Sequence, residues 1–154
     1  MDFASYVSGF VDGEGCFSVS FNVRRKLKTG IEVRPSFSVS QNKRSFSVLN
    51  EVRRYFQCGS IRFSNKDQTY KYEVRSIRDL SRKINPHFKR FPLKTSKQKD
   101  FGLFEQICQM ILQSKHLNTV HLRKIIEWSY DMNPSGKRKY SKAELLNILD
   151  KMKK

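Results

Sequence analysis

A carboxylate stands at the end of a short segment that reads as a helix, YVSGFVDGEG, residues 6–15. The C-terminal end of a helix carries partial negative charge, so Asp12 and Glu14 are unfavourable there unless a cation lies beside them. A divalent cation held by Glu14 and by a main-chain oxygen such as that of Gly13 would meet this need, and Mg²⁺ prefers such oxygen ligands. An ion pair between Glu14 and a nearby Lys or Arg explains the spacing equally well, and both interpretations stay open.

A single carboxylate is a small ligand set for hydrolysis of a phosphodiester, because a two-metal site must stabilise both the attacking and the leaving oxygen. Ser5, Gly9 and Gly13 recur every fourth residue and leave one flank of the helix almost without side chains. Each glycine costs a helix about 1 kcal/mol relative to Ala, and close backbone packing compensates for such a cost. A second copy of the chain on this flank would bring two copies of Glu14 together. Another helix of the same chain is the alternative.

The charge balance points to a polyanionic partner. The chain carries 31 Lys and Arg against 14 Asp and Glu in 154 residues, a net charge of +17. Dispersed basic side chains favour nucleic acid, because each phosphate contact releases counterions. A membrane partner is disfavoured, since no long basic amphipathic helix stands out and no apolar stretch is long enough to span a bilayer.

Cysteine usage and length set the remaining limits. Cys16, Cys58 and Cys108 are odd in number and far apart, which favours neither a disulfide framework nor a zinc site. The N-terminus, MDFASYVSGF, lacks the basic start and apolar centre of a signal peptide, so an intracellular, reducing location is expected. The length predicts a single domain over residues 1–154.

Hydrophobic periodicity predicts the elements that position these residues. Apolar residues at helical spacing predict a helix over 2–13 with Asp2 as N-cap, and alternation then predicts a strand from Cys16 and a second one over 31–40. A helix over 45–56 and a second strand pair, SIRFS and TYKYEVRS, repeat this arrangement. The fold class is therefore α+β, with helix, hairpin, helix, hairpin, helix in order and a four-stranded antiparallel sheet backed by helices.

The last half of the chain is predicted to be mainly helical. IRDLSRKI reads as a short helix ended by Asn85 and Pro86, and Ser96 is the expected N-cap of the next helix. PSGKRKY is a basic loop, and Ser141 with Glu144 forms a capping box before the C-terminal helix.

The outer faces of the two hairpins carry hydroxyls, amides and charges. A two-stranded ribbon fits the DNA major groove, where Arg reads guanine, Asn and Gln read adenine, and Ser serves several bases. A solvated sheet face explains the alternation alone about as well, but the net charge and the basic loop favour DNA. The side chains predicted to contact DNA are Ser18, Ser20, Asn22, Arg24, Arg25, Lys26, Lys28, Glu32, Arg34, Ser36, Ser38, Ser40, Lys43, Arg44, Arg62, Ser64, Lys66, Gln68, Lys71, Glu73, Arg75, Lys137, Arg138 and Lys139.

YVSGFVDGEG resembles the LAGLIDADG motif, and the chain resembles the single-motif, homodimeric LAGLIDADG homing endonucleases. The resemblance extends through both hairpins to SFSVSQNKRS, PLKTSKQKDF and GKRKYSKAELLNILD. It implies an α-β-β-α-β-β-α fold with a saddle-shaped sheet, and a nuclease that makes Mg²⁺-dependent double-strand breaks in a long, pseudo-palindromic DNA target. Mn²⁺ or Ca²⁺ is expected to substitute for Mg²⁺ in binding. Such proteins are commonly encoded in introns of organelles or microbes, so a chloroplast, a mitochondrion or a microbial cytoplasm is the expected location.

The resemblance also assigns roles to single residues. The motif helices of the family form the dimer interface, which places Ser5, Gly9, Asp12 and Gly13 there. The last acidic residue of the motif binds the catalytic metal, so Glu14 is the expected ligand, with the carbonyl oxygen of Gly13 beside it. Gln41 and Lys97 match a glutamine and a lysine that order solvent and stabilise charge near the scissile phosphate, with Lys94 as the alternative to Lys97.

The sequence departs from the family pattern in two places. Asp is common where Glu14 stands, and Ser45 takes a position where a basic residue often assists, although Lys43 and Arg44 precede it. The same fold also serves RNA-splicing maturases and DNA-binding proteins that do not cleave. Intron RNA is therefore an alternative partner.

Overall fold

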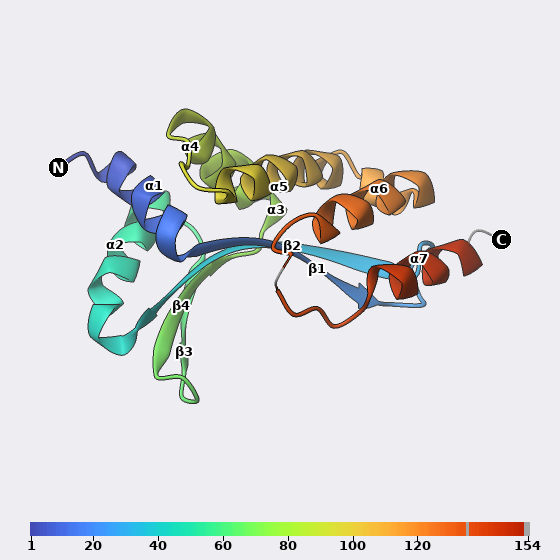
Figure 1. Ribbon diagram of the computed structural model, residues 1–154, viewed down its shortest axis with the longest axis horizontal. Helices are drawn as coiled ribbons and strands as arrows, with labels where there is room; N and C mark the ends of the chain where they lie inside the picture. The colour runs from blue at the N-terminus through green and yellow to red at the C-terminus, as the bar shows by residue number, and fades with distance from the viewer. Residues whose placement is uncertain (135, 153–154) are drawn as a thin grey trace.

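The computed structural model describes residues 1–134 and 136–152 (Figure 1). The strands are β1 (Gly15–Val23), β2 (Ile31–Asn42), β3 (Ser60–Ser64) and β4 (Thr69–Val74). The α-helices are α1 (Phe3–Glu14), α2 (Phe46–Phe56), α3 (Ile77–Asp79), α4 (Asn85–Arg90), α5 (Lys97–Leu112), α6 (Thr119–Tyr130) and α7 (Lys142–Lys151). Two 3₁₀ turns, η1 (Lys43–Ser45) and η3 (Lys115–Leu117), and a π-helical turn, η2 (Leu80–Ile84), complete the described elements.

The four strands form one antiparallel sheet in the order β1-β2-β4-β3. β2 is the longest strand and pairs with β1 along one half and with β4 along the other, from Gly15↔Val39 to Asn42↔Thr69. The prediction of an α+β fold with two hairpins and this order of elements is confirmed. In Figure 1 the sheet is strongly twisted, and α1, α4, α5 and α6 lie on one side of it.

Alternation along the strands separates a core face from a polar face. Phe17, Phe37 and Tyr72 are fully buried beneath the helices. The residues next to each of them on its strand point to the opposite face of the sheet. The phenylalanines of this core pack edge to face or tilted against Phe88 and Phe104 of the helical layer. The helices thus cover one face of the sheet and leave the polar face uncovered. No helix within the described ranges has the length and apolar composition to cross a membrane.

A buried histidine ties α1 to the helical layer. Ser8 donates its hydroxyl hydrogen to the carbonyl of Phe91, and its oxygen lies 3.1 Å from Nε2 of His87. The hydroxyl of Tyr55 lies 2.9 Å from Nδ1 of the same ring. Both contacts are satisfied when Nε2 carries the proton and Nδ1 accepts from Tyr55. Burial lowers the pKa of His87 to about 4, so the ring is neutral at pH 7 and fixes the orientation of α1 without a charge.

The prediction that the helix after β4 ends at Asn85 and Pro86 is wrong. Helical structure continues from Ile77 to Arg90, because the π-helical turn η2 widens the helix and the N–H of Asn85 donates to the carbonyl of Leu80. Pro86 then lies in α4 directly after η2, and the wider π-helical turn accommodates a residue that has no N–H to donate.

The backbone where α1 meets β1 leaves no room for a side chain at residue 15. Gly15 ends the helix and starts the strand, and its N–H donates to the carbonyl of Val11. A Cβ at Gly15 would lie 2.6 Å from Cγ1 of Val11 and 2.9 Å from the carbonyl oxygen of Val11. The helix therefore turns directly into the strand only because residue 15 has no side chain.

We predict that Gly15→Ala lowers the free energy of unfolding by about 1–3 kcal/mol, because the added methyl overlaps both a side chain and backbone. Gly102→Ala is the matched control, since a Cβ at this position in α5 meets nothing within 4 Å. It should stabilise the fold by up to ~1 kcal/mol through higher helix propensity. Chemical denaturation at one fixed protein concentration measures both, and equal effects of the two substitutions would contradict the tight joint.

Candidate active site and nucleic-acid interface

The C-terminal end of α1 has a cation of its own chain beside it. The ammonium of Lys97, at the start of α5, donates to the carbonyl of Val11 at 2.9 Å and to the carbonyl of Asp12 at 3.1 Å. These carbonyls belong to the last turn of α1, where the helix dipole is negative and a cation is stabilising. Lys97 thus offsets the unfavourable charge at this end. None of the ion pairs formed within the described ranges uses Glu14.

The carboxylate of Asp12 makes the reverse contact from α1 to the segment before α5. It accepts from the backbone N–H groups of Lys94 and Thr95 and from the hydroxyl of Thr95. Burial acts to raise the pKa of Asp12, but these hydrogen bonds and the charge of Lys97 outweigh burial and lower the pKa. The carboxylate of Asp12 is thus bound within its own chain, which does not support the predicted place of Asp12 at a dimer interface.

The hydroxyl that caps the start of α5 belongs to Thr95 and not to the predicted Ser96. Ser96 makes no side-chain cap hydrogen bond, whereas the hydroxyl oxygen of Thr95 accepts from the N–H of Lys97 at 3.2 Å. The hydroxyl of Thr95 therefore serves the start of α5 and the carboxylate of Asp12 at once. The sequence offered two adjacent hydroxyl residues and no means to choose between them.

The structure brings the three predicted catalytic residues to one end of the sheet. Glu14 is exposed and directly precedes Gly15, which pairs with Val39 of β2. Gln41 lies two residues beyond Val39 on the same strand and so shares its face, and Lys97 binds the carbonyls just before Glu14. Lys94, the alternative to Lys97, is exposed and contributes its backbone N–H to Asp12.

Glu14 and Gly13 are the candidate metal ligands of this chain. Within residues 1–134 and 136–152 no group of three or more His, Cys, Asp and Glu side chains could hold a metal. The exposed carboxylate of Glu14 and the carbonyl of the adjacent Gly13 are oxygen donors of the kind that Mg²⁺ takes, and Mg²⁺ fills the rest of its shell with water or phosphate. The donors present fit such an ion as one contribution to a shared site.

The bare flank of α1 is open. A Cβ at Gly9 or at Gly13 would meet nothing within 4 Å, so in the described structure no other helix of the chain covers this flank. A row of aromatic rings runs beside it, with Tyr6 stacked between Phe3 and Phe10 at centroid distances of 5.6 and 5.9 Å. The alternative that the same chain covers the glycines is therefore wrong for the described residues.

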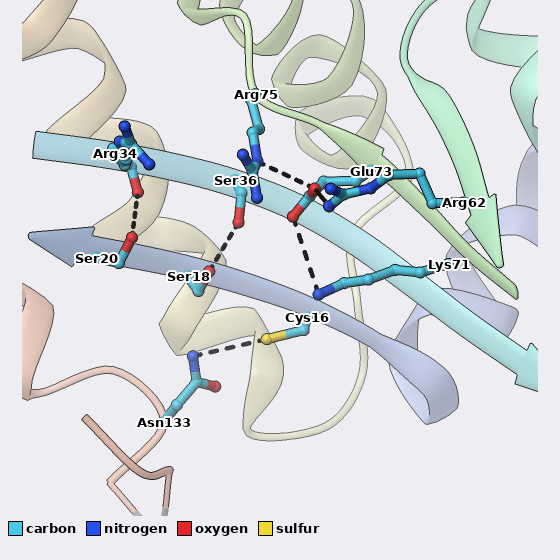
Figure 2. A network of polar contacts seen from close by, with 10 residues as sticks. All are labelled: Cys16, Ser18, Ser20, Arg34, Ser36, Arg62, Lys71, Glu73, Arg75 and Asn133. Atoms are coloured by element: carbon cyan, nitrogen blue, oxygen red, sulfur yellow. Dashed lines mark hydrogen bonds and ion pairs between the residues drawn. The ribbon is translucent and has the colours of Figure 1, made fainter. Parts of the chain in front are cut away.

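Most of the predicted DNA-contacting side chains lie on the polar face of the sheet or in the loops at its ends. Ser18 and Ser36 are cross-strand partners whose hydroxyls lie 2.9 Å apart, and Ser20 donates to the carbonyl of Arg34 (Figure 2). The exposed basic residues of this set are Arg24, Arg25, Lys26, Lys28, Arg34, Lys43, Arg44, Arg62, Lys66, Lys71, Arg75, Lys137 and Lys139. Ser20, Ser40 and Gln68 are also exposed, and Asn22 and Ser64 are half-buried.

Some side chains that were predicted to contact DNA are buried or form ion pairs within the chain. Ser38 and Glu73 are buried on the middle strands, where neighbouring side chains cover them. Glu32 is paired with Arg24 and Arg34. These carboxylates are bound by cations of the same chain, so neither is free to accept a hydrogen bond from a base.

Arg138 has a structural role that its sequence context did not reveal. Its guanidinium donates to the carbonyls of Val19, Ser129 and Met132 and lies 4.2 Å from the ring centroid of Tyr130. These contacts occupy the guanidinium, which corrects the prediction that Arg138 contacts DNA. Its exposed neighbours Lys137 and Lys139 keep that prediction.

Asn133 is a positioning residue that the sequence analysis missed. Its side-chain amide donates to the carbonyl of Phe17 at 2.6 Å, and Arg138 reaches Val19 two residues further along the same strand. β1 is an edge strand, so both side chains satisfy carbonyls that lack a strand partner. Asn133 follows the end of α6 and has a positive φ, a conformation that asparagine adopts readily, but its residue type does not reveal the partner in β1.

We predict that Lys97→Met lowers the free energy of unfolding by about 1–2 kcal/mol, because two carbonyls at the negative end of α1 lose their donor. Lys99→Met, an exposed lysine on the same helix, is the matched control and should change stability by less than about 0.5 kcal/mol. Urea denaturation of both variants makes the comparison. Equal losses would mean that the contact of Lys97 with α1 contributes nothing to stability.

The geometry described above recurs in proteins of known structure. The crystal structure of the homing endonuclease I-TnaI is 36% identical and superposes with a TM-score of 0.83 over 97% of each chain. The archaeal intron-encoded homing endonuclease I-Vdi141I, solved in complex with DNA, is 26% identical with a TM-score of 0.89 over 97% of this chain and 96% of the other. Both neighbours therefore match 97% of this chain.

A curated relative and a family model give the same result. A probable intron-encoded endonuclease of Neurospora crassa is 32% identical over 130 residues, which is 84% of this chain. The chain spans 29% of the length of that relative. The family model for the LAGLIDADG endonuclease matches residues 7–108, which include the last eight residues of α1, the whole sheet and most of α5 with Lys97. The chain therefore belongs to the LAGLIDADG endonuclease family.

Proposed function

We propose that this chain is an intron-encoded, site-specific homing endonuclease that makes Mg²⁺-dependent double-strand breaks in DNA. The observation that carries the proposal is the exposed carboxylate of Glu14, which stands at the end of an open helix flank, two residues beyond the Asp12 carbonyl that Lys97 contacts. A protein that only binds nucleic acid has no need of a carboxylate there, because phosphates and the helix dipole both repel it.

The proposed enzyme is a homodimer of one endonuclease domain over residues 1–154. The flank formed by Ser5, Gly9 and Gly13 accepts the same flank of a second copy, and two-fold symmetry then brings two copies of Glu14 to the ends of the paired helices. One carboxylate per chain becomes a pair in the dimer. Each chain then faces one half of the target, so the target is long and pseudo-palindromic.

The chain's own residues perform three tasks around the scissile phosphate. Glu14 and the Gly13 carbonyl provide oxygen ligands, Lys97 holds the last turn of α1 and adds positive charge, and Gln41 orients solvent. Bound Mg²⁺ would lower the pKa of water and neutralise charge that develops on the phosphate oxygens. Mn²⁺ or Ca²⁺ would take the same ligands for binding. Lys43 and Arg44, exposed just beyond Gln41, are the basic residues placed to assist.

Recognition of double-stranded DNA is assigned to the polar face of the sheet. The sheet is strongly twisted (Figure 1), and its exposed Arg, Lys and Ser side chains can donate to base edges and phosphates in a major groove. The intron origin and a location in an organelle or a microbial cytoplasm follow from the resemblance to intron-encoded relatives. An RNA-splicing maturase with intron RNA as partner, or a non-cleaving DNA-binding protein, is the second candidate function.

Cut-site selection from a randomised duplex library tests the proposal directly. We expect wild-type protein with Mg²⁺ to enrich one long, nearly palindromic sequence, and EDTA to abolish enrichment. Glu14→Gln should still bind that sequence but cut it at least ~10³-fold more slowly, because a charged ligand is lost.

Glu127→Gln, an exposed carboxylate on α6, is the matched control for the change in charge and should cut like wild type. If wild-type protein retains RNA or duplex DNA without cutting any DNA, the second candidate function replaces the nuclease. If Glu14→Gln cuts normally, Glu14 is not a metal ligand.

Gly9→Leu tests the dimer. The substitution should raise the helix propensity of α1 by about 1 kcal/mol, yet its side chain would occupy the surface where the second copy packs. We expect a folded monomer that has lost cleavage, with Gly102→Ala as a control that remains dimeric. Sedimentation equilibrium over a range of concentrations measures the association, and a Gly9→Leu variant that dimerises like wild type would place the interface elsewhere.

A further inference from the structure

Glu73 lies at the centre of a cluster of cations on the polar face of the sheet (Figure 2). Its Oε1 atom is 2.6 Å from Nη2 of Arg62 and 3.0 Å from Nε of Arg75, and its Oε2 atom is 3.9 Å from Nζ of Lys71. The carboxylate is only 7% exposed, whereas the three cations are 46–60% exposed. One buried acid therefore serves three side chains that reach outward.

Strand register explains why the acid is needed. Arg62 of β3 and Lys71 of β4 are direct cross-strand partners, and like charges at such a position repel. Lys71 and Glu73 lie two residues apart on β4 and so share its polar face, and Arg75 directly follows the end of the strand. The carboxylate lies between the basic side chains and lets them gather over the middle of the sheet, with a net charge of +2 for the four residues.

The contacts also fix how each guanidinium points. Arg62 donates from Nη2 to Oε1 of Glu73, whereas Arg75 forms an ion pair with the same oxygen through Nε. Within residues 1–134 and 136–152, the two terminal nitrogens of Arg75 form no hydrogen bond or ion pair of their own. Paired donors in this geometry match the O6 and N7 atoms of guanine, but only when the guanidinium plane is held in place.

We infer that Glu73 determines sequence specificity as a positioning residue: it holds Arg62 and Arg75 in the orientation that reads bases in the middle of each half-site. This inference rests on the proposed function, because it deepens the recognition of DNA by the same face. Without the acid, the two arginines would be free to turn to phosphates, which attract any guanidinium regardless of sequence.

The inference predicts that Glu73→Gln strengthens binding to random DNA and weakens discrimination between base pairs. Binding to random duplex DNA should become a few-fold tighter, because a negative charge has been removed from a surface that faces phosphates. Discrimination at the base pairs read by Arg62 and Arg75 should fall roughly ten-fold, which is the usual worth of one bidentate base contact. A substitution that merely damaged the fold would weaken both kinds of binding.

The experiment measures binding of the full chain to the selected target, to all its single base-pair variants and to random duplex. Glu127→Gln changes the net charge equally on α6, and it should leave the base preferences as in wild type. Arg62→Ala and Arg75→Ala, each alone and combined with Glu73→Gln, complete the comparison. Arg62→Ala and Arg75→Ala should each relax base pairs that Glu73→Gln also relaxes. Adding either alanine substitution to Glu73→Gln should relax these pairs no further than Glu73→Gln alone.

Two results would overturn the inference: unchanged base preferences in Glu73→Gln, or a uniform loss at every base pair. Thermal unfolding of Glu73→Gln identifies the case in which the variant has lost its fold, and Glu73→Asp then serves as the second variant. Its shorter carboxylate keeps the charge but shifts the guanidiniums, so it should change preferences at the same base pairs. Failure of the proposed function is distinguishable, because wild-type protein would then enrich no cut site from the library, whatever DNA it binds.

Discussion

The end of helix α1 is held by two reciprocal contacts with the segment that begins α5. Lys97 donates its ammonium hydrogens to the last carbonyls of α1, and Asp12 returns a carboxylate to the backbone of Lys94 and Thr95. Each contact satisfies groups that a helix end or a loop leaves without partners. Together they fix residues more than 80 positions apart in the chain at the point where Glu14 leaves the helix. The contacts hold the backbone at the end of α1 in place, and with it the residue that carries the exposed carboxylate of Glu14.

Stabilisation of α1 from one side leaves its other side available. The neutral His87 cluster and the contacts with α5 hold the helix against the core, so the chain does not need the glycine flank for its own stability. The polar face of the sheet is left open in the same way, because every strand side chain that builds the core points toward the helices. Both open surfaces therefore result from a core that uses only one side of each element.

The sequence predicted the fold well where a single period dominates. Alternation located all four strands, and Asp2 and the Ser141–Glu144 capping box mark helix starts that the structure confirms. It failed where backbone geometry or distant partners decide. The π-helical turn before Pro86 has no signature in residue types, and Arg138 looked like one more exposed cation because its three carbonyl partners come from β1 and from the end of α6. Periodicity likewise gives the face of a residue but not its neighbours, so Glu73 could not be separated from the exposed charges beside it.

The joint at Gly15 has a consequence for how such a protein can change its target over evolutionary time. The last turn of α1 and the first residue of β1 touch without an intervening loop, so the distance from Glu14 to each side chain of β1 is set by backbone alone. Substitutions along the strands alter which bases are preferred and leave that distance unchanged. In the proposed nuclease, a descendant that adopts a new DNA sequence would therefore still cut at the same number of base pairs from the bases it recognises.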